Sequence, residues 1–195
     1  MSALRKPIAD LLFTIDDLAR MPEDGKLYEL IEGEFHVSTQ PNWHHQYAAS
    51  SLFKELENWN EQSGLGVANC APGVIFSIHD AVAPDVVWIS NERLPQLLGD
   101  DGKLHAAPDL VIEVVSPGWQ NEQRDRDTKL KLYSRRGVRE YWIVDWQSQQ
   151  VEIYRRSRAR LIQSATLLRE DQLTSPLLPG FSCSVSKLFH QIPKP

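Results

Sequence analysis

The chain has 195 residues, of which 42% are hydrophobic and 24% charged, as is ordinary for one globular domain. Its formal net charge of −5 argues against a protein that coats nucleic acid non-specifically, although positive charge can still be concentrated locally. Cys70 and Cys183 lie far apart, so nothing points to a disulfide framework or a zinc knuckle.

Residues 1–13 do not read as a targeting segment. They contain Arg5, Lys6, Pro7 and Asp10 and have no long apolar core, so we expect neither a signal peptide nor a membrane span. We therefore expect a cytoplasmic protein without membrane contact. No domain boundary is visible, and residues 1–195 are expected to form a single domain.

The first half of the chain predicts two helices and a hairpin. Thr14 is the expected N-cap of a first helix, because Asp16 and Asp17 would lie in its first turn. Residues 27–37 are expected to form two short strands around Glu32 and Gly33. Apolar residues at helical spacing predict a helix over residues 45–60, which Gly64 and Gly66 would end.

The second half predicts mainly strands. They are expected over residues 67–78, 85–89, 110–115, 141–146 and 151–154, the last two forming a hairpin around Gln147 and Ser148. A helix over residues 122–136 should stop at Gly137, and the tail should add one edge strand and a short helix. This order predicts an α/β fold with a mixed central sheet flanked by helices. Its core would span about residues 27–155, with an N-terminal helix and hairpin as an extension.

Two carboxylates stand where apolar residues are expected. Glu113 interrupts the apolar run LVIEVV, and an ionised carboxylate in a buried strand is costly unless it is paired or binds a metal. Asp85 opens the apolar strand PDVVWIS. If the two strands are neighbours, both side chains can converge at one end of the sheet, where they would suit Mg²⁺. The alternatives are a buried salt bridge for Glu113 and a turn or cap for Asp85.

Positive charge is concentrated in two stretches, residues 124–139 and 155–160. Seven lysines and arginines fall in the first stretch and four arginines in the second. Interspersed acidic residues allow two interpretations of equal weight, a solvated and salt-bridged helix face or a surface that contacts phosphates.

Motifs spread over most of the chain resemble one family. They are YELIEGE at 28–34, His45-Gln46, PDVVWIS at 84–90, PDLVIEVVSP at 108–117, the spacing of Asp125, Lys129 and Tyr133, GVREYWIVD at 137–145, and SPLLPGFS at 175–182. Together they resemble the Uma family of restriction endonucleases in the PD-(D/E)XK nuclease superfamily, over about residues 14–189. The resemblance implies a restriction-endonuclease-like fold, and a divalent-cation site at Asp85 and Glu113 to which the backbone carbonyl of Val114 contributes.

The chain departs from the superfamily signature at Val115, where the lysine should stand. The resemblance implies that the following helix supplies this lysine instead. On a helical projection that takes Lys129 as zero, the apolar face lies close to Lys129, whereas Lys131 falls about 200° away. We therefore expect Lys129 to point toward the sheet as the catalytic lysine. Its alternative is an ion pair with Asp125, four residues earlier.

Further candidates carry less weight. Tyr133 and Arg124 would position the nucleic-acid backbone. His45 matches the family's histidine and would contact a phosphate of the substrate, although a histidine there is more often a cap or packing residue. Glu29 could add a metal ligand.

These observations predict an Mg²⁺- or Mn²⁺-dependent endonuclease that acts on nucleic acid, with double-stranded DNA as the expected substrate. The alternative is a catalytically silent copy of this fold that binds nucleic acid or protein. Cutting both strands of a duplex with one site per chain favours a homodimer. The six tryptophans and the apolar segment 177–189 are the candidate interface.

Overall fold

A six-stranded sheet forms the centre of the molecule. The computed structural model describes residues 12–118 and 122–192. Across the sheet the strand order is β10-β9-β8-β7-β6-β3, and only β7 and β8 run parallel. The strands are β3 (Gly66–Cys70), β6 (Val86–Ser90), β7 (Leu110–Val114), β8 (Glu140–Asp145), β9 (Gln150–Ser157) and β10 (Arg160–Leu167). The predicted mixed central sheet is confirmed.

Two smaller sheets and several helices complete the fold. One sheet has the order β2-β1-β5-β4, and the other pairs β11 with β12. Their strands are β1 (Leu27–Ile31), β2 (Glu34–Ser38), β4 (Val74–Ser77), β5 (Asp80–Val82), β11 (Gln172–Ser175) and β12 (Leu178–Ser184). The helices are α1 (Ile15–Leu18), α2 (Trp43–Ser63), α3 (Leu94–Leu97), the π-helix η1 (Arg124–Lys129), α5 (Leu130–Arg136) and α6 (Val185–Leu188).

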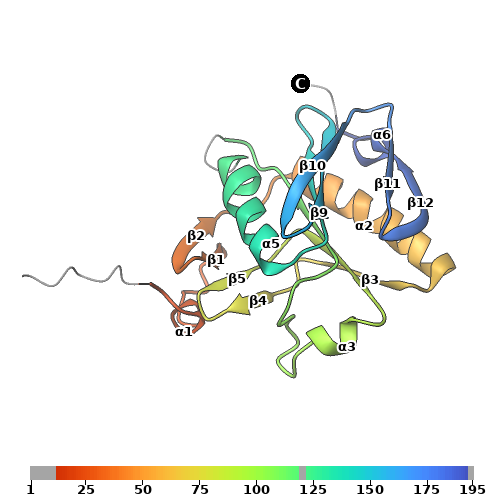
Figure 1. Cartoon of the computed structure of the whole chain (residues 1–195). Coiled ribbons are helices and arrows are strands. Elements are labelled where there is room, and N and C mark those ends of the chain that lie inside the picture. Colours follow the sequence, from red (N-terminus) through yellow and green to blue (C-terminus); the bar gives the residue numbers. More distant parts are fainter. Residues whose placement is uncertain (1–11, 119–121, 193–195) are drawn as a thin grey trace, which may run out of the picture.

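The central sheet separates two apolar cores, with α2 on one face and α5 on the other (Figure 1). Strand β7 shows how its residues divide between them. Leu110, Ile112 and Val114 face the core that α2 covers, whereas Val111 lies in the core that includes α5. Side chains of a strand alternate between faces, so Glu113 lies on the α5 side. A strand covered on both faces reads as a continuous apolar run, as the sequence indicated.

The long helix α2 confirms its prediction and extends it at both ends. Asn42 precedes the helix, and its side-chain Oδ1 accepts a hydrogen bond from the His45 backbone N–H at 2.9 Å. This N-cap explains why the helix starts before residue 45. Gly64 follows with a left-handed backbone, φ 62° and ψ 21°, and ends the helix.

The predicted hairpin around Glu32 and Gly33 is also confirmed. Both residues have positive φ, 54° and 77°, as a two-residue turn between twisted strands requires. The hairpin carries Glu29 on β1 toward the central sheet. The hairpin thereby contributes a side chain to the site described below.

The prediction of a single strand over residues 67–78 is wrong. The chain breaks at Ala71, which has a φ of 47°, and at Pro72 and Gly73. β3 before the break pairs with β6 in the central sheet, whereas β4 after it pairs with β5 in the smaller sheet. Proline and glycine end pairing, but they do not reveal that the chain changes sheets.

The tail contains three strands and a short helix rather than one strand. β10 is the edge of the central sheet and is largely exposed, so it carries little hydrophobic pattern. The candidate dimer interface at residues 177–189 is wrong as well. Leu178, Phe181, Val185 and Phe189 are buried in the chain's own core.

The expectation for the N-terminal segment falls mostly on residues 1–11, outside the described range. Within residues 12–118 and 122–192, no helix is both long and apolar enough to cross a membrane.

Candidate active site

Asp85 and Glu113 face one cavity from neighbouring strands. β6 and β7 are antiparallel with Val86 opposite Ile112, which sets the preceding Asp85 against Glu113. The Asp85 carboxylate also accepts the backbone N–H of Val114 at Oδ2, 2.7 Å away. The arrangement required by the sequence argument, two adjacent strands with converging carboxylates, is therefore present.

Lys129 points into the same cavity. It ends the π-helix η1, and only 3% of the residue is exposed. Its Nζ lies 2.9 Å from Glu113 Oε1 and 3.1 Å from Glu29 Oε1. Lys131 is exposed, as the helical phase predicted. Single π-turns occur frequently at functional sites, and this wider turn is where the lysine enters the site.

The alternative interpretation of Lys129 is not supported, whereas that of Glu113 is. The alternative partner for Lys129 was Asp125, but within the described residues Lys129 forms no ion pair with it. Asp125 instead accepts from Arg124 Nε at 3.3 Å. The alternative for Glu113, a buried salt bridge, does exist. Its cation is Lys129 itself, so the ion pair and the expected catalytic role involve the same lysine.

Tyr133 lies one helical turn after Lys129 and is completely buried. Its hydroxyl donates to Glu113 Oε1 at 2.6 Å. The ring therefore orients a carboxylate of the site. The predicted contact between Tyr133 and substrate stays a prediction.

Glu29 and His45 reach the site from outside the central sheet. Glu29 Oε1 accepts the backbone N–H of Ala83 at 3.1 Å, while its Oε2 is buried without a hydrogen-bond partner among the described residues. His45 Nε2 lies 3.2 Å from Asp85 Oδ2, and its Nδ1 is also buried without a partner in the described part of the chain. The metal role of Glu29 and the substrate role of His45 stay predictions.

Two neighbouring cavities that share lining residues form the site. The inner cavity, of about 60 Å³, is lined by Glu29, His45, Asp85, Glu113, Val114, Asp125 and Lys129, among others. The outer cavity, of about 360 Å³, is lined by residues 37–42, Ser116, Pro117 and Arg124. Arg124 lines both, and its NH1 donates to Ser38 Oγ at 2.7 Å. We call the outer cavity the mouth cavity.

Negative charge exceeds positive charge in the inner cavity. Four carboxylates line it, those of Glu29, Asp85, Glu113 and Asp125, against the two cations Lys129 and Arg124. Burial raises the pKa of Glu113 above its ordinary value. Lys129 opposes this rise and Asp85 adds to it. Burial alone would lower the pKa of Lys129, but Glu113 and Glu29 outweigh it and raise that pKa, so the lysine stays charged.

The donor set fits a cation that keeps most of its water. Asp85 Oδ1 and Glu113 Oε2 accept no hydrogen bond from the described residues, so each carboxylate retains an oxygen for a ligand. No group of three or more acidic, histidine or cysteine side chains in the described ranges is arranged to hold a metal. Mg²⁺ commonly binds through one or two carboxylates, waters and substrate phosphates. A divalent cation would also favour the ionised form of Glu113, whose pKa is raised by burial.

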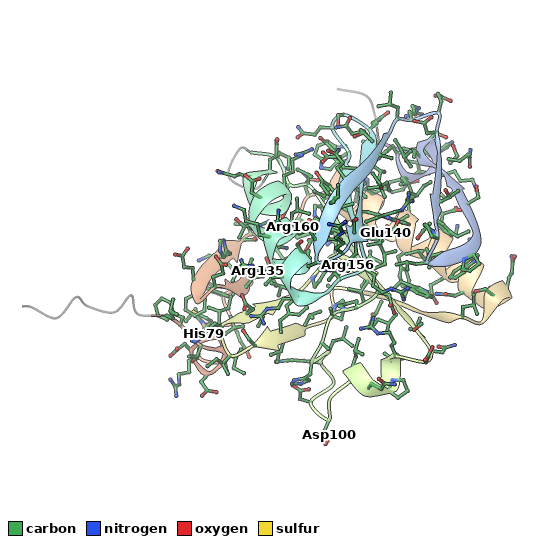
Figure 2. The ribbon with its side chains drawn as sticks, viewed as in Figure 1. His79, Asp100, Arg135, Glu140, Arg156 and Arg160 are labelled. Atoms are coloured by element: carbon green, nitrogen blue, oxygen red, sulfur yellow. The ribbon has the colours of Figure 1, made fainter. Side chains whose placement is uncertain are left out.

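Most of the basic residues outside the site are paired. Arg156, which is labelled in Figure 2, donates to the backbone carbonyls of Tyr133, Ser134 and Val138. Further pairs are Arg126 with Asp145 and Glu152, Arg135 with Glu32, Arg136 with Asp80, and Arg139 with Asp109. In the two basic stretches, Lys131, Arg158 and Arg160 are the residues whose side chains form no ion pair or hydrogen bond with any described residue, backbone included. The salt-bridged interpretation therefore holds for most of these arginines.

We did not predict from the sequence that residues 38–42 border the site. Pro41 and Asn42 form a break before the helix and carried no functional prediction, yet this segment lines the mouth cavity. The available signal was its position, because the break directly precedes His45. The sequence did not show that the break borders the carboxylates.

Comparisons with known proteins agree with this architecture. The family model Uma2, described as "Putative restriction endonuclease", matches residues 15–186. A solved structure from Anabaena variabilis, titled as a "putative nuclease belonging to DUF820", aligns with a TM-score of 0.71. Its identity is 20%, and the alignment covers 91% of this chain and 98% of that chain, which shows a shared fold. No curated protein matches the chain.

Proposed function

Because the chain belongs to the Uma2 family, we propose that it is a metal-dependent endonuclease that hydrolyses phosphodiester bonds of nucleic acid. Double-stranded DNA is the proposed substrate. One observation carries the proposal: Asp85 and Glu113 meet on adjacent strands, and the ammonium of Lys129 lies 2.9 Å from Glu113. Two carboxylates beside one lysine are the groups that metal-assisted phosphodiester hydrolysis needs.

Asp85 and Glu113 would hold Mg²⁺ or Mn²⁺, with the backbone carbonyl of Val114 and the carboxylate of Glu29 as further proposed ligands. A divalent cation bound there supplies a Lewis acid and lowers the pKa of a bound water. The chain's own groups position these ligands. Tyr133 holds Glu113 through its hydroxyl, and His45 together with the Val114 N–H holds Asp85.

Lys129 and Arg124 supply positive charge at different depths. Lys129 sits beside Glu113 and would orient the attacking water or stabilise charge that grows on the phosphate. Arg124 lies between the two cavities and would bind a phosphate oxygen as the substrate enters. The buried lysine would therefore act on the reacting group and the outer arginine on its position.

Plasmid cleavage tests the proposal directly. Wild-type protein with Mg²⁺ or Mn²⁺ should nick or linearise plasmid DNA. Asp85→Ala should lower the rate at least about 100-fold, because one of two charged ligands is lost. Chelation with EDTA should have the same effect. Equal cleavage by wild type and variant would contradict the proposed site.

A silent nucleic-acid- or protein-binding module is the second candidate. The observation that favours it is the burial of Lys129, whose ammonium is already shared between Glu113 and Glu29. Binding of DNA by the wild type without any cleavage, in either metal, would support the silent module.

We also propose a homodimer, because one site per chain must act on both strands of a duplex. Light scattering at micromolar concentration should then give about 44.6 kDa, twice the chain mass of 22.3 kDa. A mass of one chain would contradict the dimer and leave single-strand nicking as the expected reaction.

A further inference from the structure

The mouth cavity and the inner cavity are neighbours that share part of their lining. Ser38, Thr39, Ser116 and Arg124 line both cavities, so a group in the outer one lies next to the carboxylates of the inner one. With about 360 Å³, the mouth cavity falls at the lower end of the range for small-molecule sites. Whatever occupies it would be a neighbour of the scissile phosphate.

The lining of the mouth cavity differs in chemistry from that of the inner cavity. Arg124 is its cation, and no acidic side chain is among the described residues that line it. Hydroxyl and amide side chains supply most of the remaining polar groups. Thr39 Oγ1 and the amide nitrogen of Asn42 form no hydrogen bond with described residues. One cation beside neutral donors and acceptors suits a ligand with one phosphate and one polar heterocycle.

The size of the cavity decides which form of nucleic acid can enter. Bases in a duplex are paired and stacked, so they cannot reach into a cavity of this volume. An unpaired nucleotide can enter, either from a single strand or from an unpaired position in a duplex, where extrusion costs least. The cavity therefore favours one nucleotide outside the base stack.

Trp43 provides an independent observation in the chain segment beside the mouth cavity, although it is not itself one of the described lining residues. It directly follows the lining residue Asn42 and is 73% exposed, the most exposed large hydrophobic residue in the described ranges. In contrast, Trp88 and Trp142 are buried. An exposed indole face stacks on unpaired bases of any sequence, whereas paired bases already stack on one another.

We propose that the mouth cavity is a subsite for one unpaired nucleotide beside the scissile phosphate, with Arg124 on its phosphate and Trp43 against a base. This inference rests on the proposed nuclease function and narrows its substrate. The nucleotide comes from a single strand or from an unpaired position in a duplex.

Fluorescence anisotropy in EDTA tests the subsite without cleavage. Three labelled oligonucleotides of matched sequence serve as probes: a single strand, a duplex with one unpaired nucleotide and a fully paired duplex. Thr39→Tyr fills the cavity from an exposed position, and Trp43→Ala removes the stacking face. Thr174→Tyr and Ile162→Ala are the matched controls, because both residues are exposed on strands outside the site.

Wild type should bind at least one of the unpaired probes more tightly than the paired duplex. Each site variant should weaken binding of that probe at least about fivefold, the lower range for loss of one stacked base. The controls should bind as wild type does. Preference for the single strand alone, or for the duplex with an unpaired nucleotide, identifies the source of the nucleotide.

Three outcomes would overturn the subsite. They are equal binding of all probes by wild type, no binding of any probe, and equal losses in site variants and controls. Plasmid cleavage by wild type together with any of them would refute the subsite and leave the proposed nuclease standing. If the probes bind as expected but the wild type does not cleave plasmid DNA, the subsite would stand and the proposed nuclease would be refuted.

Discussion

Replacing Lys129 with glutamine should lower the cleavage rate by about 10²–10³-fold, the usual cost of losing one group that stabilises charge in a transition state. The lysine is paired with Glu113 and is proposed to take the role of the lysine that the superfamily signature would place at Val115. Its ammonium is buried beside Glu113 and stays charged, and a cation on an exposed side chain does not reach that position. Single-turnover cleavage of a labelled substrate measures this loss.

The structure changes which substitution is informative. Lys129→Ala would leave Glu113 and Glu29 buried without their cation, at a cost of roughly 3–5 kcal/mol in unfolding free energy. Lys129→Ala would therefore combine loss of the proposed catalytic cation with loss of stability. Lys129→Gln keeps a hydrogen-bond donor, and thermal unfolding checks that it remains folded.

Lys131→Ala is the matched control, because this lysine is two residues away and exposed. It should leave the cleavage rate unchanged and weaken nucleic-acid binding by no more than about twofold, as for one phosphate contact. Loss of cleavage in Lys131→Ala but not in Lys129→Gln would refute the lysine assignment. If both variants cleave as wild type does, the catalytic cation is a different residue.

Glu113→Gln should reduce Mn²⁺ affinity at least about 100-fold in calorimetric titration. Loss of an outer-shell partner alone typically costs 10–100-fold, and Glu113 is proposed as a direct ligand. The variant should still fold, since burial already disfavours the charge of this carboxylate and Lys129 retains Glu29 as a partner. The titration therefore separates metal binding from stability.

Glu140→Gln is the appropriate control for this titration. Glu140 is also a buried strand glutamate, but its oxygens accept from Trp142 Nε1 and Ser175 Oγ, both 2.8 Å away. Its replacement should leave Mn²⁺ binding unchanged. Equal Mn²⁺ affinity in wild type and Glu113→Gln would remove the proposed metal site, whereas an effect of Glu29→Gln would support Glu29 as a further ligand.

For several parts of this protein, the pattern of neighbouring residues in the sequence was sufficient to predict the structure. The apolar run around Glu113 predicted a strand covered on both faces, and helical spacing placed Lys129 inward and Lys131 outward. Gly64 ends the long helix through its left-handed backbone, as predicted. These features could be read from the sequence because they depend on residues a few positions apart.

Tertiary structure decided which distant groups meet. Glu29 and His45 approach Lys129 and Asp85 from a separate sheet and from a helix end, and the break at residues 71–73 sends two strands into different sheets. The paired arginines and the mouth cavity likewise depend on elements far apart in the chain. Periodicity reports which face a side chain occupies. The partner on that face is set by packing of the whole chain, because contact energies between distant segments leave no local pattern.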